Sequence, residues 1–281
     1  MMVSHAESSL FDRLHGHPLI IAHRGYRACF PENTHCAFAA SVGRCGMIEL
    51  DVRLSADNLA VVFHDHVLGR TSDAVNVSAA FGLHSLAVHD WRFDQLSQLD
   101  VGSWFIAADP FGSIHQGLVE RSRLLACMPQ RLPSLPQVLR WAVTTNMPLN
   151  IELKDMGTPR LNQTLVTVVV HDVATATIEQ LVVLSSFNHT ILRLCRRLAP
   201  HLATAALQEG SHPSDLIPYL HTLGVIAYHP ADQITDAELI TAVRSAGLHV
   251  NVFTVNDPDR QRQLFAAGAT GIFTDYPNSY L

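Results

Sequence analysis

GMIELDVRLSADNLAVVFH, residues 46–64, contains two short apolar runs of strand type, at 46–51 and 60–64. Only residues 52–59 separate the two runs, whereas a connection between parallel strands needs about a dozen residues or more. We therefore expect residues 60–64 to return antiparallel to the first run, in a hairpin that turns at Asp57 and Asn58. The second run is then the arm of a hairpin and is not a parallel strand of the sheet.

Short apolar runs alternate with helical patterns along the rest of the chain, which is typical of a parallel α/β fold. The predicted parallel strands lie at 18–22, 46–51, 148–153, 181–185, 202–207, 223–228, 248–254 and 271–274. One of the helical patterns between them starts after a predicted Ser134 cap, and others end on a glycine. Eight such strands in 281 residues predict a single domain over 1–281 with an eight-stranded α/β barrel.

Residues 66–131 interrupt this rhythm, because they contain polar turns, Trp91 and Trp104 but no convincing pair of strand and helix. A long irregular segment inside a compact domain is usually a lid or a small subdomain. In a barrel, the loops that follow the carboxyl ends of the strands build the active site. We therefore predict an insertion at 66–131, after the second barrel strand, that overhangs the site.

Composition excludes several classes of partner. The formal net charge is −6 and no basic patch is visible, which argues against a nucleic-acid partner. The five cysteines form no CxxC motif, so the sequence favours a reducing, cytoplasmic location over a disulfide framework or a zinc knuckle. No apolar run reaches the roughly 18 residues of a membrane span, and residues 1–17 lack the pattern of a signal peptide. The oligomeric state stays open.

Acidic side chains gather at the ends of two predicted strands. Because side chains alternate along a strand, Glu49 and Asp51 share one face, and Glu152 and Lys154 share one face of the strand at 148–153. The three carboxylates predict a site for one hard divalent cation, Mg²⁺ or Ca²⁺, since like charges this close destabilise one another without a cation. The alternative is that each carboxylate pairs with a basic residue such as Arg24, Arg53 or Lys154.

Two histidines end strands at the same predicted mouth, His23 on the first strand and His64 on the hairpin arm. Histidine is the natural acid or base near neutral pH, because its unperturbed pKa lies close to 6.5. The chain has 17 histidines, so any single one is weak evidence for catalysis. Arg24, next to His23, offers a planar fork that suits a phosphate group.

A series of short motifs runs along the chain in order. They are HRG at 23–25, PENT at 31–34, ELD at 49–51, HD at 64–65, LGRT at 68–71, DVGSWF at 100–105, LPSLPQVL at 132–139, NIELK at 150–154, SSF at 185–187, FTVND at 253–257 and GIFTDYP at 271–277. This ordered set resembles the glycerophosphodiester phosphodiesterase family and spans nearly the whole chain. The resemblance implies a TIM barrel with a small insertion.

The resemblance also implies the activity, which is metal-dependent hydrolysis of glycerophosphodiesters to sn-glycerol 3-phosphate and an alcohol. The family is thought to use the glycerol 2-hydroxyl as nucleophile, giving a cyclic phosphate that water then opens. Carried over by position, its metal ligands fall on Glu49, Asp51 and Glu152, its acid–base pair on His23 and His64, and its phosphate-facing cations on Arg24 and Lys154. The sequence does not say which histidine is the acid.

Two further positions take a role from the resemblance. Glu32, in PENT, is expected to orient the site or contact the glycerol, and a turn or capping carboxylate is an equal alternative. Phe253 stands where many members have tryptophan, and it is expected to form part of an apolar wall against the glycerol carbons. A plain core role for Phe253 is the alternative.

Two other functions stay open at this point. One is a phospholipase D-like hydrolysis of lysophospholipids, for which the stretches FGLHSLAVHDW and SWFIAADPF in the insertion would supply an apolar mouth, unless they form its core. The other is a non-catalytic barrel that binds a phosphodiester, although the intact set of carboxylates and histidines argues against it. A sugar-phosphate isomerase or aldolase would need a phosphate-binding glycine loop after the last strands, and GIFTDYPN is not one.

Overall fold

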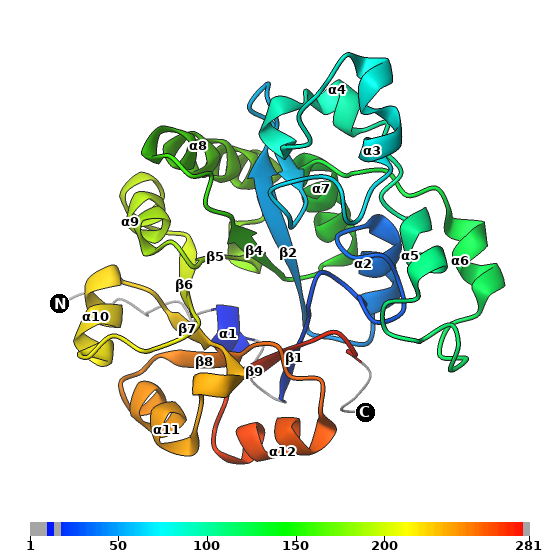
Figure 1. Ribbon diagram of the computed structural model, residues 1–281. Helices are drawn as coiled ribbons and strands as arrows, with labels where there is room; N and C mark the ends of the chain where they lie inside the picture. Colours follow the sequence, from blue (N-terminus) through cyan, green and yellow to red (C-terminus); the bar gives the residue numbers. More distant parts are fainter. Residues whose placement is uncertain (1–9, 14–17, 278–281) are drawn as a thin grey trace.

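The computed structural model describes residues 10–13 and 18–277, in which nine strands form one sheet. The strands are β1 (Leu19–Ala22), β2 (Met47–Leu54), β3 (Ala60–Val62), β4 (Leu149–Leu153), β5 (Val182–Ser186), β6 (Ala203–Gln208), β7 (Ala227–Pro230), β8 (His249–Val252) and β9 (Gly271–Thr274). All except β3 run parallel, in the order β1-β2-β4-β5-β6-β7-β8-β9, and β9 pairs with β1. The sheet is closed, which confirms the predicted eight-stranded TIM barrel (Figure 1).

The hairpin predicted from residues 46–64 is also confirmed. β3 runs antiparallel to β2, with Val52 opposite Val62 and Leu54 opposite Ala60. At the turn, Asn58 has a φ of 59°, a left-handed conformation that asparagine tolerates better than most residues. The Asn58 N–H donates to the Ser55 carbonyl at 3.0 Å. The Phe63 N–H donates to the Asp51 carbonyl at 3.0 Å, so the arm places residue 64 beside the middle of β2, next to Asp51.

Helices surround the barrel on its outside (Figure 1). They are α2 (His35–Ser41), α7 (Leu135–Thr145), α8 (Pro159–Ala176), α9 (His189–Leu198), α10 (Leu216–Leu223), α11 (Ala237–Ser245) and α12 (Pro258–Ala266). α7 starts after Ser134, as predicted, and the Ser134 N–H donates to the Gln137 side chain in a capping box. The predicted strand at 223–228 begins instead at Ala227, because α10 continues to Leu223 and is capped by Gly224 with a φ of 71°.

The segment at 66–131 folds into short helical pieces beside α2 and α7 (Figure 1). They are α3 (Ala74–Val77), η1 (Ser78–Phe81), η2 (Val88–Asp90), α4 (Phe93–Leu96), α5 (Ser103–Ala108) and α6 (Arg121–Cys127). Trp91 packs with Val61 and Phe63 of the hairpin arm, while Phe105 packs with Phe30 and with Ala37 of α2. The side chains of Trp91 and Phe105 are fully buried, so these two residues belong to a core of the segment.

The two ends of the barrel differ in character. At the amino-terminal end, Phe11 of α1 (Leu10–Arg13) packs with inward-facing residues of the strands, among them Ile21, Met47 and Phe273. The carboxyl ends of the strands carry the polar residues that the sequence singled out. Closure of one end by apolar packing leaves the other end as the mouth, as is usual for this fold.

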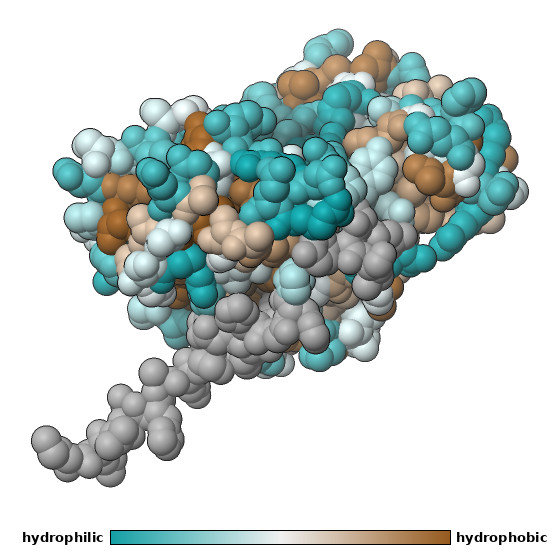
Figure 2. Space-filling model, turned by 90° about the horizontal axis from the view of Figure 1, so that it is seen from below, coloured by the Kyte–Doolittle hydropathy of each residue, from teal (hydrophilic) through white to brown (hydrophobic). Residues whose placement is uncertain are grey.

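The outer surface mixes residue types. On the face shown in Figure 2, hydrophilic residues predominate and hydrophobic ones gather only in small, separate groups. Among the helices of the described ranges, none has both the length and the apolar character needed to cross a membrane. The prediction about a signal peptide concerns residues 1–17, most of which lie outside the described residues.

Candidate active site

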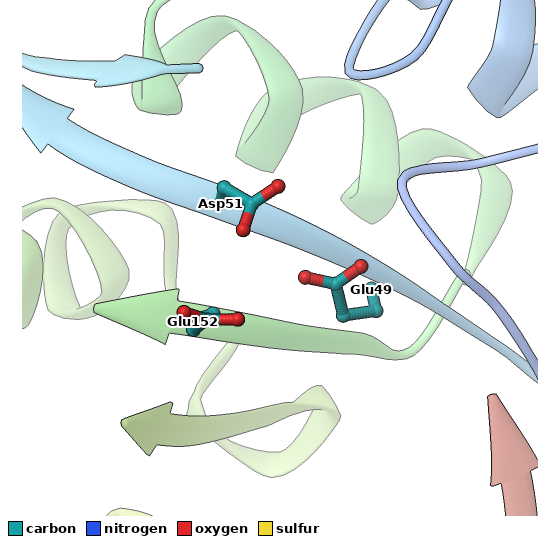
Figure 3. A group of neighbouring side chains, drawn as sticks. All are labelled: Glu49, Asp51 and Glu152. Atoms are coloured by element: carbon teal, nitrogen blue, oxygen red, sulfur yellow. The ribbon is translucent and has the colours of Figure 1, made fainter. Parts of the chain in front are cut away.

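Three carboxylates on the neighbouring strands β2 and β4 face one another inside the mouth (Figure 3). Asp51 lies opposite Glu152 in the parallel ladder, and Glu49 precedes Asp51 on the same face of β2. One oxygen of each residue lies within 4.8 Å of an oxygen of the other two, and all three residues are buried. The structure thus brings together the residues that the sequence proposes as metal ligands.

Glu49 is the least satisfied member of this cluster. Burial, together with the charges of Asp51 and Glu152, raises the pKa of Glu49 well above its usual value. Its Oε2 accepts a hydrogen bond from the Arg24 backbone N–H at 2.8 Å, whereas its buried Oε1 has no hydrogen-bond partner among the described residues. An oxygen ligand in this condition fits a hard divalent cation, which would compensate the lost hydration.

Basic residues compensate the other two carboxylates. Lys154 Nζ lies 2.9 Å from Asp51 Oδ1 and 2.5 Å from Glu152 Oε1, and Arg24 Nε lies 3.3 Å from Asp51 Oδ2. Although burial alone would raise the pKa of Asp51, Lys154 and Arg24 hold it well below its usual value. The alternative in which basic residues neutralise the carboxylates therefore applies to Asp51 and Glu152, but Glu49 Oε1 has no partner within residues 10–13 and 18–277. Arg53 instead donates to the His64 carbonyl at 2.8 Å.

The turn after β1 explains why HRG occurs as a unit. Arg24 and Gly25 have φ values of 55° and 82°, so the chain reverses sharply directly after His23. A Cβ on Gly25 would lie 2.8 Å from Ala37 of α2, which leaves no room for a side chain. This turn directs the Arg24 N–H toward Glu49 and its guanidinium toward Asp51 and Glu32.

Both histidines line the mouth, and each is paired with a carboxylate through Nδ1. His23 Nδ1 lies 2.8 Å from Asp275 Oδ1, directly after β9, and His64 Nδ1 lies 2.6 Å from Asp65 Oδ1. Burial and the nearby Arg24 charge lower the pKa of His23, and the contact with Asp275 opposes this shift. Because a carboxylate accepts the proton on Nδ1, each ring can present Nε2 for proton transfer.

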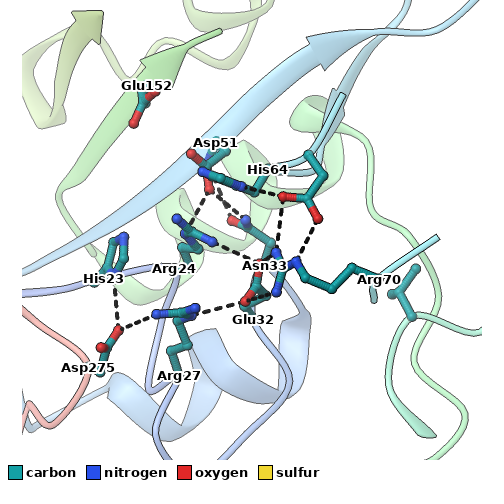
Figure 4. A network of polar contacts seen from close by, with 12 residues as sticks. His23, Arg24, Arg27, Glu32, Asn33, Asp51, His64, Arg70, Glu152 and Asp275 are labelled. Carbon is teal, nitrogen blue, oxygen red and sulfur yellow. Dashed lines mark hydrogen bonds and ion pairs between the residues drawn. The ribbon is translucent and has the colours of Figure 1, made fainter. Parts of the chain in front are cut away.

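Glu32 lies at the centre of a group of three arginines (Figure 4). It accepts hydrogen bonds from Arg24 at 2.9 Å, from Arg27 at 3.0 Å and from Arg70 at 2.6 Å. Despite its burial, hydrogen bonds from Arg70 and the charges of Arg24 and Arg27 lower the pKa of Glu32 to about 2. Glu32 is not among the residues that line the cavity.

Four partners in this site are not singled out by the sequence, although three lie in its motifs. Asp65, Arg70 and Asp275 belong to HD, LGRT and GIFTDYP, and Arg27 follows HRG. Their contacts join segments up to 252 positions apart in the chain. Spacing along the sequence therefore gives no signal for the contacts of Asp275 with His23 and Arg27, although the motif positions could have marked Asp65, Arg70 and Asp275.

The mouth opens into a cavity of about 660 Å³, a usual size for a small-molecule site. Phe253, the first residue after β8, lines it together with Phe187 and Phe273. The Phe253 ring lies perpendicular to the Phe187 ring, with centroids 5.5 Å apart, and 6.4 Å from the Phe273 ring. Phe253 is therefore part of an aromatic wall of the cavity, which differs in character from the charged residues that also line it.

Known proteins resemble this chain over most of its length. The model of the glycerophosphoryl diester phosphodiesterase family matches residues 23–279. A glycerophosphodiester phosphodiesterase of Bacillus altitudinis is 30% identical over 266 residues, which covers 92% of this chain and 95% of that protein. The protein YqiK of Bacillus subtilis is 33% identical over 264 residues, with coverages of 92% and 95%.

A solved structure gives the same result. A phosphodiesterase of Oleispira antarctica, in complex with its product sn-glycerol-3-phosphate, matches with a TM-score of 0.78 and 26% sequence identity, and covers 96% of this chain and 97% of that one. The fold and the site define a phosphodiester hydrolase built on a TIM barrel. The chain belongs to the glycerophosphoryl diester phosphodiesterase family, and the resemblance read from its motifs is confirmed.

Proposed function

We propose that the chain hydrolyses glycerophosphodiesters to sn-glycerol 3-phosphate and an alcohol by metal-dependent acid–base catalysis. Membership of the family supports glycerophosphodiesters as the substrate class. The single observation that carries the finer proposal is the cluster of Glu49, Asp51 and Glu152 at one cavity of the barrel. Glu49 and Glu152 line this cavity together with His23 and His64. No other group of carboxylates, histidines or cysteines in the described ranges is arranged to hold a metal.

Glu49, Asp51 and Glu152 would hold one divalent cation, either Mg²⁺ or Ca²⁺. A bound cation of this kind neutralises charge on the phosphodiester oxygens. The support is the chemistry of the ligand set, which offers only oxygens, and the buried Glu49 Oε1, to which no group in the described part of the chain donates a hydrogen bond. Arg24 and Lys154 contact Asp51, and each would donate some of its hydrogen bonds to the phosphate.

His23 and His64 would exchange protons with the reacting oxygens. One histidine takes the proton of the attacking hydroxyl as the new P–O bond forms, and the other gives a proton to the alcohol as its P–O bond breaks. If the glycerol 2-hydroxyl attacks, the product is a cyclic phosphate that water opens with the roles of the histidines reversed. The support is that both residues line the cavity and keep Nε2 free of the carboxylate contact.

Other parts of the molecule take roles in the same proposal. Phe253 would contact the glycerol carbons as part of the aromatic wall. The segment at 66–131 would act as a small subdomain next to the mouth. A cytoplasmic location is also proposed, and its support is that all five cysteines are free thiols.

Lysophospholipid hydrolysis is the second candidate and has less support. The bulky residues Trp91 and Phe105, which belong to the stretches proposed as an apolar mouth, are fully buried. Neither residue can then contact an acyl chain without a rearrangement of the segment's core.

The substrate class is tested with glycerophosphocholine, glycerophosphoethanolamine, glycerophosphoglycerol and lysophosphatidylcholine, each with Mg²⁺ or Ca²⁺ added. We expect the highest kcat/KM on one of the three glycerophosphodiesters. Release of choline from lysophosphatidylcholine alone would replace the proposal with the lipid activity. Binding of the diesters without turnover of any of them would support the non-catalytic barrel instead.

A further inference from the structure

The two cavity histidines are joined by a continuous chain of charged side chains (Figure 4). From His23 the chain passes to Asp275 at 2.8 Å, to Arg27 at 3.1 Å and to Glu32 at 3.0 Å. From Glu32 it passes to Arg70 at 2.6 Å. The last two contacts, Arg70 to Asp65 and Asp65 to His64, are each 2.6 Å.

This series of charged side chains has the same order of residue types on both sides of Glu32. On each side an arginine bridges Glu32 to an aspartate, and the aspartate contacts the Nδ1 atom of a histidine. The two aspartates come from distant parts of the chain, one after β9 and the other after the hairpin arm. Closeness in sequence therefore does not explain why the two sides of Glu32 match. The series of charged side chains connects three separate loops of the mouth.

We propose that Asp275 and Asp65 are positioning residues for His23 and His64, and that Glu32 couples the two pairs by holding Arg27 and Arg70 in place. The inference rests on the proposed function, since it concerns how the proposed acid–base pair is held. It assigns Glu32 to the support of the histidines and not to contact with the glycerol.

The physical basis is the geometry of proton transfer. A carboxylate on Nδ1 fixes the tautomer and the ring plane, so that Nε2 points in one direction. An aspartate can rotate about its own side-chain bonds unless another donor holds it. Arg70 supplies that donor to Asp65, whereas Arg27 and the Asn256 side chain both donate to Asp275. Glu32 is buried and fixes both arginines, so a change at Glu32 reaches both histidines together.

The first test replaces each aspartate by its uncharged isostere, Asp275→Asn and Asp65→Asn. An asparagine amide can present its N–H₂ group to Nδ1 and favour the wrong tautomer, so we expect kcat to fall by at least about tenfold. KM should change by less than about twofold, because neither aspartate is proposed to bind substrate. Asp57→Asn is the matched control, since Asp57 holds the hairpin turn through Ser55 and Phe93, away from the cavity.

A pH profile separates positioning from a general loss of structure. The charged groups acting on His23 are Arg24, Arg27 and Asp275, and of these only Asp275 raises its pKa. Asp275→Asn should therefore move one limb of the kcat profile to lower pH. A limb on the acidic side would mark His23 as the base, and one on the alkaline side would mark it as the acid.

The coupling is tested by a double-mutant cycle with Glu32→Gln and the two aspartate variants. If Glu32 acts through Arg27 and Arg70, its loss already misplaces both histidines, so each double variant should lose much less activity than the product of the single losses. Arg70→Met tests the Arg70–Asp65 side separately, and because Arg70 is partly exposed its replacement carries less risk for folding. Arg70→Met should lower kcat and be non-additive with Asp65→Asn but additive with Asp275→Asn.

The results separate this inference from the proposed function. An inactive wild-type protein would overturn the proposed function and, with it, the inference. An active wild type whose aspartate variants retain the kcat of Asp57→Asn would overturn the inference alone. Fully additive losses in folded double variants would overturn the coupling role of Glu32. Folding is checked for every variant by its melting temperature.

Discussion

At the scale of single residues, His23 and His64 are the groups on which the proposed chemistry depends. Replacement of either by alanine removes one proton-transfer group and leaves the carboxylate cluster and the cations in place. We expect kcat to fall by about 10²- to 10⁴-fold, measured as release of sn-glycerol 3-phosphate. His171→Ala is the control, since His171 is exposed on α8. Near-normal turnover in either cavity variant would contradict the proposed pair.

The depressed pKa of Glu32 predicts a pH dependence of stability. Glu32 titrates at about 2 in the folded protein, below its ordinary value of 4.5, so its ionised form stabilises the fold above about pH 4.5. This contribution is lost as the pH falls from about 4.5 through about 2. Glu32→Gln should therefore lower the free energy of unfolding at pH 7, on the order of 2–3 kcal/mol, and the difference from wild type should shrink over this range. Urea denaturation at several pH values measures it, and a difference that stays constant down to pH 2 would refute the assignment.

The identity of the site residues is largely predictable, but their contacts are not. Alternation along β2 and β4 places Glu49, Asp51 and Glu152 on one side without any structure. The pairing of His23 with Asp275 depends on closure of the barrel between its first and last strands, which no local pattern reports. Glu32, expected at the mouth, lies against three arginines, because the turn after β1 brings Arg24 and Arg27 to it.

At the scale of elements, the length of a connection indicates strand direction better than the strand propensity of the residues does. The eight residues at 52–59 cannot cross over between parallel strands, and this restriction separated β3 from the barrel. The predicted start of β7 is wrong, because Leu223 and the apolar residues after it also fit the sequence pattern of a strand. There the left-handed Gly224 ends a helix, and the strand starts only at Ala227.

The start of α11 offers a test of an element that is separate from the chemistry. Asp236 is its N-cap, and its side chain accepts a hydrogen bond from the Leu239 N–H at 2.8 Å. Asp236→Ala should cost about 1 kcal/mol of stability, seen in chemical denaturation, with no change in kcat. Asp236→Asn keeps an acceptor and should restore most of the loss. Equal stability of the alanine and asparagine variants would argue against the cap.

At the scale of the whole molecule, the barrel follows from the rhythm of strands and helices, whereas residues 66–131 do not. Their short helical pieces are defined by packing onto the hairpin arm and α2, as the burial of Trp91 and Phe105 shows. Such packing joins residues without a common period, so a sequence pattern cannot reveal it. The strands β2 and β4 supply the three carboxylates of the mouth. The loops that follow the strands supply His23, Arg24 and Glu32.

The most direct test of the central claim follows glycerophosphocholine by phosphorus NMR with metal-free protein, then after addition of Mg²⁺ or Ca²⁺. The account predicts that the resonance of sn-glycerol 3-phosphate appears only after a cation is added. Glu49→Gln, which removes a charge from the cluster and keeps its shape, should bind the cation more weakly and lose most of this turnover. Turnover that persists in EDTA, or phosphocholine as the product, would contradict the account.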